Sequence, residues 1–274
     1  MRRVRLLERP LIFIVCAPRS GSTWLRRMLD AHPEISAGQE SGLFTQDGGL
    51  GSLLENYFAN APEYQLREYV DEPTLLRLIR NLAVTVLSVK ANKEAKRIIV
   101  EKTPAHAFNI EAILRVFPEA RFIHLIRDGR DVAASIVYGG QTWRPGWPTE
   151  IFAAAKMWKD YNEAILGAWP SLRGEALHLL RYEELLEQPE RRLIDLFDFA
   201  GARPLHDDDV RHIVEQHTIE RYRLSIQAES DWQLLHYGTS GQWQQTFSAR
   251  DIRDFKVSAG DLLIKFGYET DRGW

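Results

Sequence analysis

The chain has little of several features that mark other classes of protein. Its 274 residues contain one cysteine, Cys16, which excludes an internal disulfide and a cysteine-based zinc cluster. No stretch approaches the roughly 18 uninterrupted apolar residues of a membrane span. Internal repeats, low-complexity segments and linkers are not apparent. We therefore expect a single domain over residues 1–274, without a membrane span, in a reducing compartment such as the cytoplasm.

An excess of charge of one sign is also missing. Lys and Arg number 35 and Asp and Glu 38, a net charge of −3, so composition gives no reason to expect nucleic acid as a partner. The first 30 residues are an exception, with seven basic and two acidic residues. An anionic ligand near the start of the chain is therefore plausible. The 45% hydrophobic and 27% charged residues are typical of a globular protein with a large core.

Short apolar runs alternate with helical patterns along the chain. Four nearly continuous apolar runs predict strands buried on both faces of a parallel sheet: Leu11–Cys16, Arg97–Val100, Arg121–Ile126 and Ala176–Leu180. The first run is only six residues long, which is too short for a membrane span and marginal for the apolar region of a signal peptide, so a buried strand is the better interpretation. Helices are predicted at Ser22–Ala31, Pro73–Val89, Ile151–Trp169, Pro189–Ala200 and Ala249–Phe266. The pattern predicts an α/β fold of three layers, a central mostly parallel sheet flanked by helices.

Two segments lack clear periodicity and are rich in Gly, Pro and aromatic residues. Residues 43–70 and 138–150 are predicted to be long loops that contact substrate. Trp143 and Trp147, in the second segment, are candidates for the lining of an acceptor pocket or for surface packing of the loop. His124, inside a predicted strand, is expected to be a core residue.

The sharpest motif is the run APRSGSTW at residues 17–24, between the first strand and the first helix. Gly21 allows positive φ and close approach of a ligand, and Ser22 or Thr23 can cap the helix. The N–H groups at the helix start, together with Arg19, favour an anion. A Walker A loop needs a second Gly and a Lys that this run lacks, which disfavours a magnesium-dependent triphosphatase.

A second phosphate site is suggested at residues 121–135. Arg127 ends a predicted strand, and Ser135 lies two turns into the next helix, so both side chains can converge on one phosphate. A surface cluster of Arg and Asp residues is the alternative interpretation of this segment.

Together, these two segments resemble the phosphosulfate loop and the 3′-phosphate motif of sulfotransferases that use 3′-phosphoadenosine 5′-phosphosulfate (PAPS), of the bacterial, P-loop-like type. The resemblance implies a P-loop-NTPase-like fold, PAPS as the sulfuryl donor, no metal, and a small-molecule or carbohydrate hydroxyl as the acceptor. It also implies that Trp24 stacks on adenine, as aromatic side chains do on bases. The residues it assigns to the donor are Arg19, Ser20, Gly21, Ser22, Thr23, Trp24, Arg127, Ser135 and Tyr182.

The resemblance extends towards the C-terminus. Tyr182 belongs to a segment like the family's Tyr-Glu-Asp-Leu, whose Tyr lies near adenine; a Tyr at an ordinary helix start is the alternative. Residues 238–243, GTSGQW, are similar to the Gly-x-x-Gly-x-Trp loop that closes over the nucleotide. The chain departs from the family just before this loop, where His236 and Tyr237 replace a common Arg-Lys pair. Without that Arg-Lys pair, we expect either that the 3′-phosphate is bound more weakly or that another basic residue compensates.

Sulfuryl transfer needs a base for the acceptor hydroxyl, in-line geometry and positive charge at the leaving oxygen. Arg19 supplies charge but no proton, because arginine has a pKa above about 12. Lys102 resembles the lysine of the family's Glu-Lys-Ser/Thr-Pro segment, which approaches the bridging oxygen. For the base, Glu40 matches the carboxylate of the heparan-type members and is ranked first. His106, two residues beyond the register of the small-molecule members' histidine, is second.

Two other functions stay open from the sequence alone. One is a P-loop-like nucleotide kinase or hydrolase. The other is a non-catalytic nucleotide-binding protein of the same fold.

Overall fold

A five-stranded parallel sheet forms the centre of the computed structural model, which describes residues 9–59, 66–172, 174–228 and 238–274. The strand order is β2-β3-β1-β4-β5. The strands are β1 (Leu11–Val15), β2 (Ile35–Ala37), β3 (Ile98–Lys102), β4 (Arg121–Ile126) and β5 (Leu177–Arg181). The four strands predicted from apolar runs are confirmed. Strand β2 was missed because three residues are too short for a pattern to emerge.

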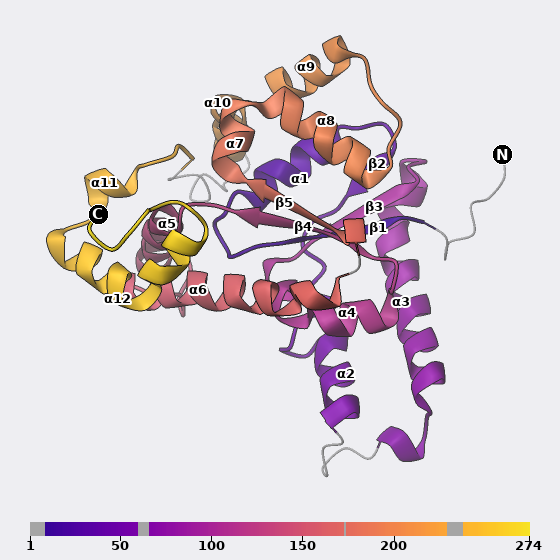
Figure 1. The fold of residues 1–274 in the computed structure, drawn as a ribbon. Coiled ribbons are helices and arrows are strands. Elements are labelled where there is room, and N and C mark those ends of the chain that lie inside the picture. Colours follow the sequence, from indigo (N-terminus) through magenta and orange to yellow (C-terminus); the bar gives the residue numbers. More distant parts are fainter. Residues whose placement is uncertain (1–8, 60–65, 173, 229–237) are drawn as a thin grey trace.

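Helices connect and cover the strands (Figure 1). The α-helices are α1 (Ser22–Asp30), α2 (Leu50–Ala59), α3 (Glu72–Lys93), α4 (Ile110–Val116), α5 (Gly129–Thr142), α6 (Ile151–Ala168), α7 (Tyr182–Glu187), α8 (Pro189–Ala200), α9 (Asp207–Gln216), α10 (Ile219–Ala228), α11 (Trp243–Thr246) and α12 (Ala249–Lys265). The five predicted helices are confirmed, with shifts of a few residues at their ends.

The two predicted long loops are a partial error. Within residues 43–70 the chain forms α2 and a 3₁₀ turn at Leu66–Glu68. Residues 138–142 are the last turn of α5. The glycines at the start of α2 concealed the helical pattern, since Gly is normally a poor helix former. At Gly51, a Cβ atom would lie 2.7 Å from the carbonyl oxygen of Phe44, so close packing requires this glycine.

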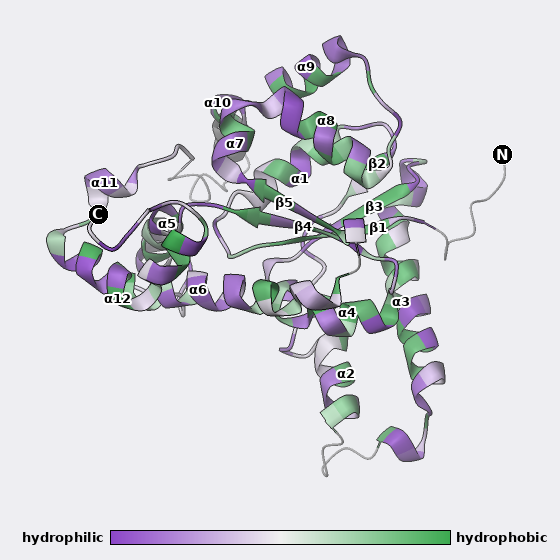
Figure 2. Cartoon of the chain, viewed as in Figure 1, coloured by the Kyte–Doolittle hydropathy of each residue, from purple (hydrophilic) through white to green (hydrophobic). Residues whose placement is uncertain are grey.

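Alternate residues of the strands face opposite sides of the sheet, which gives three layers. In β1, Ile12 and Ile14 pack with α1, α8 and α9 on one face. Phe13 and Val15 pack with α3 and α4 on the other. Figure 1 shows these helix groups above and below the sheet, and Figure 2 shows the hydrophobic residues of β4 and β5 between them. The continuous apolar runs of β1, β3 and β4 are thus explained, because both faces of these strands are covered, whereas the edge strand β5 is only partly buried.

A third apolar cluster fixes the turn between β4 and α5. It joins α5, α6 and α12 around Trp158, which is fully buried. A Cβ atom at Gly129 would lie 2.7 Å from the Trp158 ring, so only glycine fits where α5 begins. The packing sets the direction in which α5 leaves the sheet.

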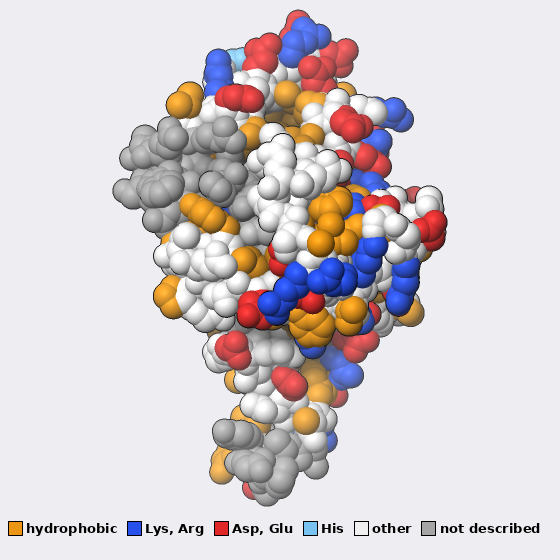
Figure 3. Space-filling view, turned by 90° about the vertical axis from the view of Figure 1, so that its left-hand side faces the viewer, with side chains coloured by type: hydrophobic (Ala, Val, Ile, Leu, Met, Phe, Trp, Pro, Cys, Tyr) orange, Lys and Arg blue, Asp and Glu red, His pale blue; other side chains and the backbone are white. Residues whose placement is uncertain are grey.

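Basic and acidic side chains are interspersed on the molecular face in Figure 3. Within the described ranges, no helix is both long and apolar enough to traverse a bilayer. The cytoplasmic location stays a prediction.

Candidate active site

A cavity of about 340 Å³ opens where the carboxyl ends of β1, β3 and β4 meet. Strand β1 lies between β3 and β4 in the sheet. The connections after β1 and after β4 therefore lead to opposite sides of β1, which makes the carboxyl end of β1 a point where the strand order reverses. Ligand sites of open α/β sheets form at such points. Among the described residues, the cavity lining comes from nine separate parts of the chain and includes Arg19, Gly21, Ser22, Thr23, Trp24, Glu40, Thr103, Arg127 and Tyr182.

The loop after β1 has an unusual backbone. Arg19 adopts φ 71° and Gly21 φ 95°, the left-handed region that costs an ordinary side chain roughly 1–2 kcal/mol. A Cβ atom at Gly21 would also lie 2.4 Å from the ring of Tyr182. The predicted positive φ of Gly21 is confirmed. The close approach is made by the Tyr182 ring, which the sequence alone did not show.

Helix α1 presents free backbone donors to the cavity. The prediction that Ser22 or Thr23 caps the helix is wrong, because Gly21 is the N-cap and no side chain caps it. The first bond of the helix runs from Leu25 N–H to Gly21 O at 3.1 Å. The N–H groups of Ser22, Thr23 and Trp24 therefore precede the helical ladder, a geometry that favours an anion.

Arg19 reaches the second predicted phosphate motif. Its Nε donates to Ser135 Oγ at 2.8 Å, and its guanidinium lies 5.6 Å from the centre of the Trp143 ring. Burial, with repulsion from Arg127, lowers the pKa of Arg19 to about 10, so it stays protonated at neutral pH. Ser20 and Ser135 are each 1% exposed and do not line the cavity.

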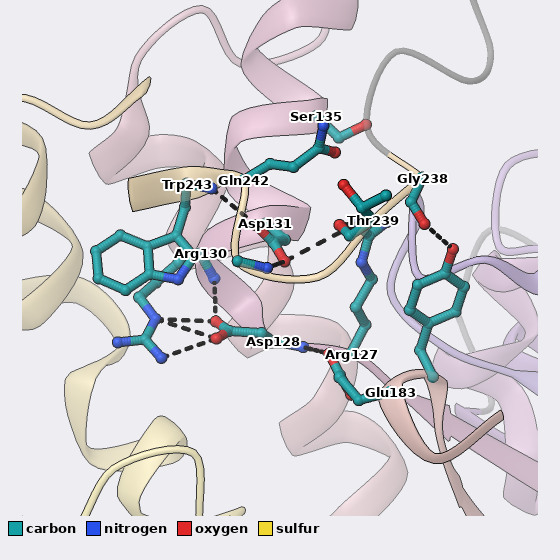
Figure 4. Close-up of polar contacts among 12 residues, drawn as sticks. Arg127, Asp128, Arg130, Asp131, Ser135, Glu183, Gly238, Thr239, Gln242 and Trp243 are labelled. Carbon is teal, nitrogen blue, oxygen red and sulfur yellow. Dashed lines mark hydrogen bonds and ion pairs between the residues drawn. The ribbon is translucent and has the colours of Figure 1, made fainter. Parts of the chain in front are cut away.

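Arg127 connects three segments that are distant in the sequence. Its Nη1 donates to Arg19 O at 3.2 Å and its Nη2 to Thr239 O at 3.1 Å. The guanidinium lies 4.5 Å from the centre of the Tyr182 ring. Figure 4 shows Arg127 between the turn at Asp128 and residues 238–243. The two predicted phosphate motifs and the predicted C-terminal loop thus meet at one guanidinium. His236 and Tyr237 lie outside the described residues.

An aromatic slot forms one end of the cavity. Trp24 and Tyr182 meet edge to face with ring centres 5.6 Å apart, and Ile219 and Tyr222 complete the lining. The Tyr182 hydroxyl donates to Gly238 O at 2.6 Å. Ile219 and Tyr222 lie in α10 and belong to no local motif, so the sequence alone does not identify them.

Lys102 and Glu40 form an ion pair beside this slot. Lys102 is only 2% exposed, whereas the Glu40 side chain is 52% exposed. Lys102 Nζ also lies 3.3 Å from Thr23 Oγ1. The two predicted catalytic residues are therefore in contact with each other and with the loop after β1.

His106 is placed differently from the prediction. It is fully buried, and its Nε2 accepts a hydrogen bond from Phe44 N at 3.0 Å. Its Nδ1 lies 2.8 Å from Glu101 Oε2. With both ring nitrogens engaged and no contact with the cavity, His106 is not positioned to act as a base, and the prediction that ranked it second is wrong.

Glu101 organises the segment that follows Glu40. Its Oε1 accepts hydrogen bonds from Ser41 N at 3.0 Å, from Ser41 Oγ at 2.8 Å and from Thr103 Oγ1 at 2.7 Å. Burial alone would raise the pKa of Glu101, but its contacts with His106, Thr103 and Ser41 hold that pKa below the ordinary value. A buried network of this kind fixes the backbone beside Glu40.

A further part of the cavity lining is apolar and aromatic. It consists of Trp143, Trp147, Met157 and Tyr161. The two tryptophan rings are 5.7 Å apart and tilted. Burial, with the nearby Cys16 and Glu40, raises the pKa of Tyr161 to about 12. His124 is a core residue as predicted, fully buried with Nε2 3.0 Å from Asn162 Oδ1. No group of metal-ligating side chains occurs among the described residues.

Comparisons with known proteins agree on one family. Residues 10–208 match the model of a family described as "Sulfotransferase family". The protein-tyrosine sulfotransferase of Drosophila melanogaster is 26% identical over 269 residues, 96% of this chain. The nodulation protein NoeE of Sinorhizobium fredii is 25% identical over 95% of this chain and 66% of its own length. The chain spans 52%, about half, of the length of the Drosophila relative.

The fold has solved counterparts. Mouse sulfotransferase SULT7A1, in a complex with PAP, superposes with a TM-score of 0.60 at 15% identity. The match covers 96% of this chain and 84% of the mouse chain. At this identity the similarity concerns the fold alone, and it agrees with the predicted P-loop-like arrangement.

Proposed function

Because this chain belongs to the sulfotransferase family, we propose that it transfers a sulfuryl group from PAPS to the hydroxyl of a small-molecule or carbohydrate acceptor. One observation carries the proposal. The loop after β1, Glu40 and Arg127 line a single cavity at the carboxyl edge of the sheet, and Lys102 is joined to it through its ion pair with Glu40. This arrangement supports a common site for the donor and for the transfer step.

The donor binds in the cavity, with its phosphate groups and its adenine held by different lining residues. The N–H groups at the start of α1 and the hydroxyls of Ser22 and Thr23 hold the 5′-phosphosulfate. Arg127, which borders the cavity, holds the 3′-phosphate in place of its carbonyl partners. Adenine lies against Trp24 and Tyr182. Ser20 and Ser135 are buried and do not line the cavity, and Ser135 accepts a hydrogen bond from Arg19 Nε.

The chemistry needs one proton acceptor and two positive charges. Glu40, the exposed member of its ion pair, takes the proton of the acceptor hydroxyl as the oxygen attacks sulfur. A new S–O bond forms while the bond to the bridging phosphate oxygen breaks. Lys102 and Arg19 stabilise the negative charge that develops on the leaving 3′-phosphoadenosine 5′-phosphate (PAP). The contact between Lys102 and Thr23 supports this role, because Thr23 belongs to the phosphosulfate loop.

The acceptor lies at the apolar part of the cavity, against Trp143, Trp147 and Tyr161. A planar small molecule or the flat face of a sugar ring packs favourably on aromatic rings of this kind. A phenolic hydroxyl, including that of a tyrosyl side chain, is a second acceptor class. It is favoured by the aromatic lining and by the activity named for the Drosophila relative.

Calorimetry tests the donor half of the proposal. Wild-type protein is expected to bind PAP at least about tenfold more tightly than adenosine 5′-phosphate, since a charge-assisted bond to phosphate contributes about 1.5–3 kcal/mol. Arg127→Ala should remove this preference. Arg121→Ala is the matched control, because Arg121 lies at the other end of β4 and donates to Phe199 O. Equal affinity of the wild type for both nucleotides would contradict the proposal. Magnesium-dependent turnover of ATP would instead favour the kinase or hydrolase alternative.

A further inference from the structure

Asp131 lies in the first turn of α5 and holds a loop from the far end of the chain. It is fully buried. Its Oδ2 accepts the N–H of Gly241 at 2.8 Å, and its Oδ1 accepts the N–H of Trp243 at 2.9 Å. Figure 4 shows both bonds reaching the same carboxylate from residues 238–243, which we call the C-terminal loop. Charged acceptors of backbone N–H groups form the stronger class of hydrogen bond.

The same loop contacts two residues assigned to the donor. Thr239 O accepts from Arg127 Nη2 and Gly238 O accepts from the Tyr182 hydroxyl. Asp131 follows Arg127 by four residues, and its Oδ2 lies 4.0 Å from Arg127 Nη2. One buried carboxylate therefore sets the positions of the loop and of the guanidinium that the loop touches.

We propose that Asp131 is a positioning residue for the sulfuryl donor, which orders the C-terminal loop and Arg127 around the 3′-phosphate. The inference rests on the proposed use of a 3′-phosphorylated nucleotide. Asp131 does not line the cavity and needs no contact with the nucleotide. It acts through the two N–H groups that it accepts and through the charge of Arg127.

Asparagine at this position cannot reproduce the arrangement. Its amide has one acceptor and one donor group, so an NH₂ would face either Gly241 N–H or Trp243 N–H. An unpaired buried donor and a lost charge both disfavour the observed loop conformation. Burial raises the pKa of Asp131, and Arg127 and the two N–H groups oppose that rise. The charged form of Asp131 is thus stabilised by Arg127 and by the N–H groups of Gly241 and Trp243, which it holds in place.

The test measures the affinities of PAP and adenosine 5′-phosphate for Asp131→Asn by calorimetry. We expect the dissociation constant for PAP to rise about tenfold or more, on the order of one lost charge-assisted bond. The constant for adenosine 5′-phosphate should change less than about threefold, because it lacks the 3′-phosphate. Glu34→Gln is the matched control. Glu34 is also a buried carboxylate that accepts a backbone N–H, from Arg203 at 2.9 Å, but it is remote from the cavity lining. The control variant should keep the wild-type preference for PAP.

A second variant, Gly241→Ala, tests the inference independently if Asp131→Asn does not fold. Gly241 adopts φ 79°, and a Cβ atom there would meet no atom within 4 Å. Gly241→Ala therefore strains the loop backbone without a clash and should also weaken PAP selectively. The double variant should lose little beyond either single variant. Unchanged or tighter PAP binding by Asp131→Asn would overturn the inference, as would equal losses for both nucleotides. Failure of the wild type to prefer PAP would instead refute the proposed function.

Discussion

Replacing Glu101 by Gln should cost stability and activity together. Glu101 Oε2 faces His106 Nδ1 at 2.8 Å, and His106 Nε2 is already committed as acceptor to Phe44 N. The proton of a neutral His106 therefore lies on Nδ1, so the amide NH₂ of Gln would face either this N–H or the Ser41 and Thr103 donors at the other oxygen. Breaking a buried polar pair of this type costs about 3–5 kcal/mol. A chain of this size loses about 10 °C in melting temperature for such a change.

Urea unfolding followed by circular dichroism measures the loss, with Glu94→Gln as control. Glu94 is 30% exposed and accepts from Ser36 Oγ and Lys90, so its substitution should cost less than about 1 kcal/mol. The difference between wild type and Glu101→Gln should be full above pH 4.5 and shrink as the pH falls below it, because the folded pKa of Glu101 is depressed.

Activity provides the second readout of this prediction. Glu101 holds Ser41, next to Glu40, so kcat should fall while the affinity for PAP is retained. A stability loss below about 1 kcal/mol, or a selective loss of PAP affinity, would refute the reasoning.

Two further predictions concern single side chains. Gly21→Ala should weaken PAP binding about tenfold or more in calorimetry, because the added Cβ would displace the Tyr182 ring. Gly48→Ala is the control: Gly48 has φ 83° with open space around it, so the variant has similar backbone strain without a clash and should bind PAP normally. Burial lowers the pKa of His124 to about 4 from 6.5, so the unfolded state takes up a proton in this interval and stability falls as the pH drops from 6.5 to 4. His124→Gln should abolish that contribution in thermal unfolding measured across this pH range, and an unchanged pH profile would contradict the burial of a neutral His124.

The sheet and the loop after β1 could be predicted because both have local patterns. Strands covered on both faces give continuous apolar runs such as Leu11–Cys16, and the loop at residues 17–24 combines glycine, hydroxyls and arginine between a strand and a helix. Lys102 and Glu40, which the sequence motifs single out, form an ion pair, and their catalytic roles stay predictions. The strands and the loop each depend on a few neighbouring residues, whereas the ion pair joins residues 62 positions apart.

The remaining parts of the site depend on contacts between distant segments. Asp131 was interpreted with its neighbours as part of a phosphate motif or a surface cluster, yet its carboxylate binds residues 110 and 112 positions away. His106 has the residue type of a base, but the fold buries it against Glu101 and Phe44. Tyr222 joins the cavity through the arrival of α10, for which the sequence has no motif. Tertiary packing decides all three roles.

Sulfuryl transfer from radiolabelled PAPS tests the central claim most directly. Wild-type protein, incubated with labelled PAPS and a panel of phenols and sugars, is predicted to form a labelled acceptor and one PAP for each product molecule. Glu40→Gln and Lys102→Met should each lower kcat at least about a hundredfold, the usual size of a lost acid–base or charge-stabilising group. Tight PAP binding without transfer to any acceptor of the panel or of a host extract would contradict the account and favour a non-catalytic nucleotide-binding protein.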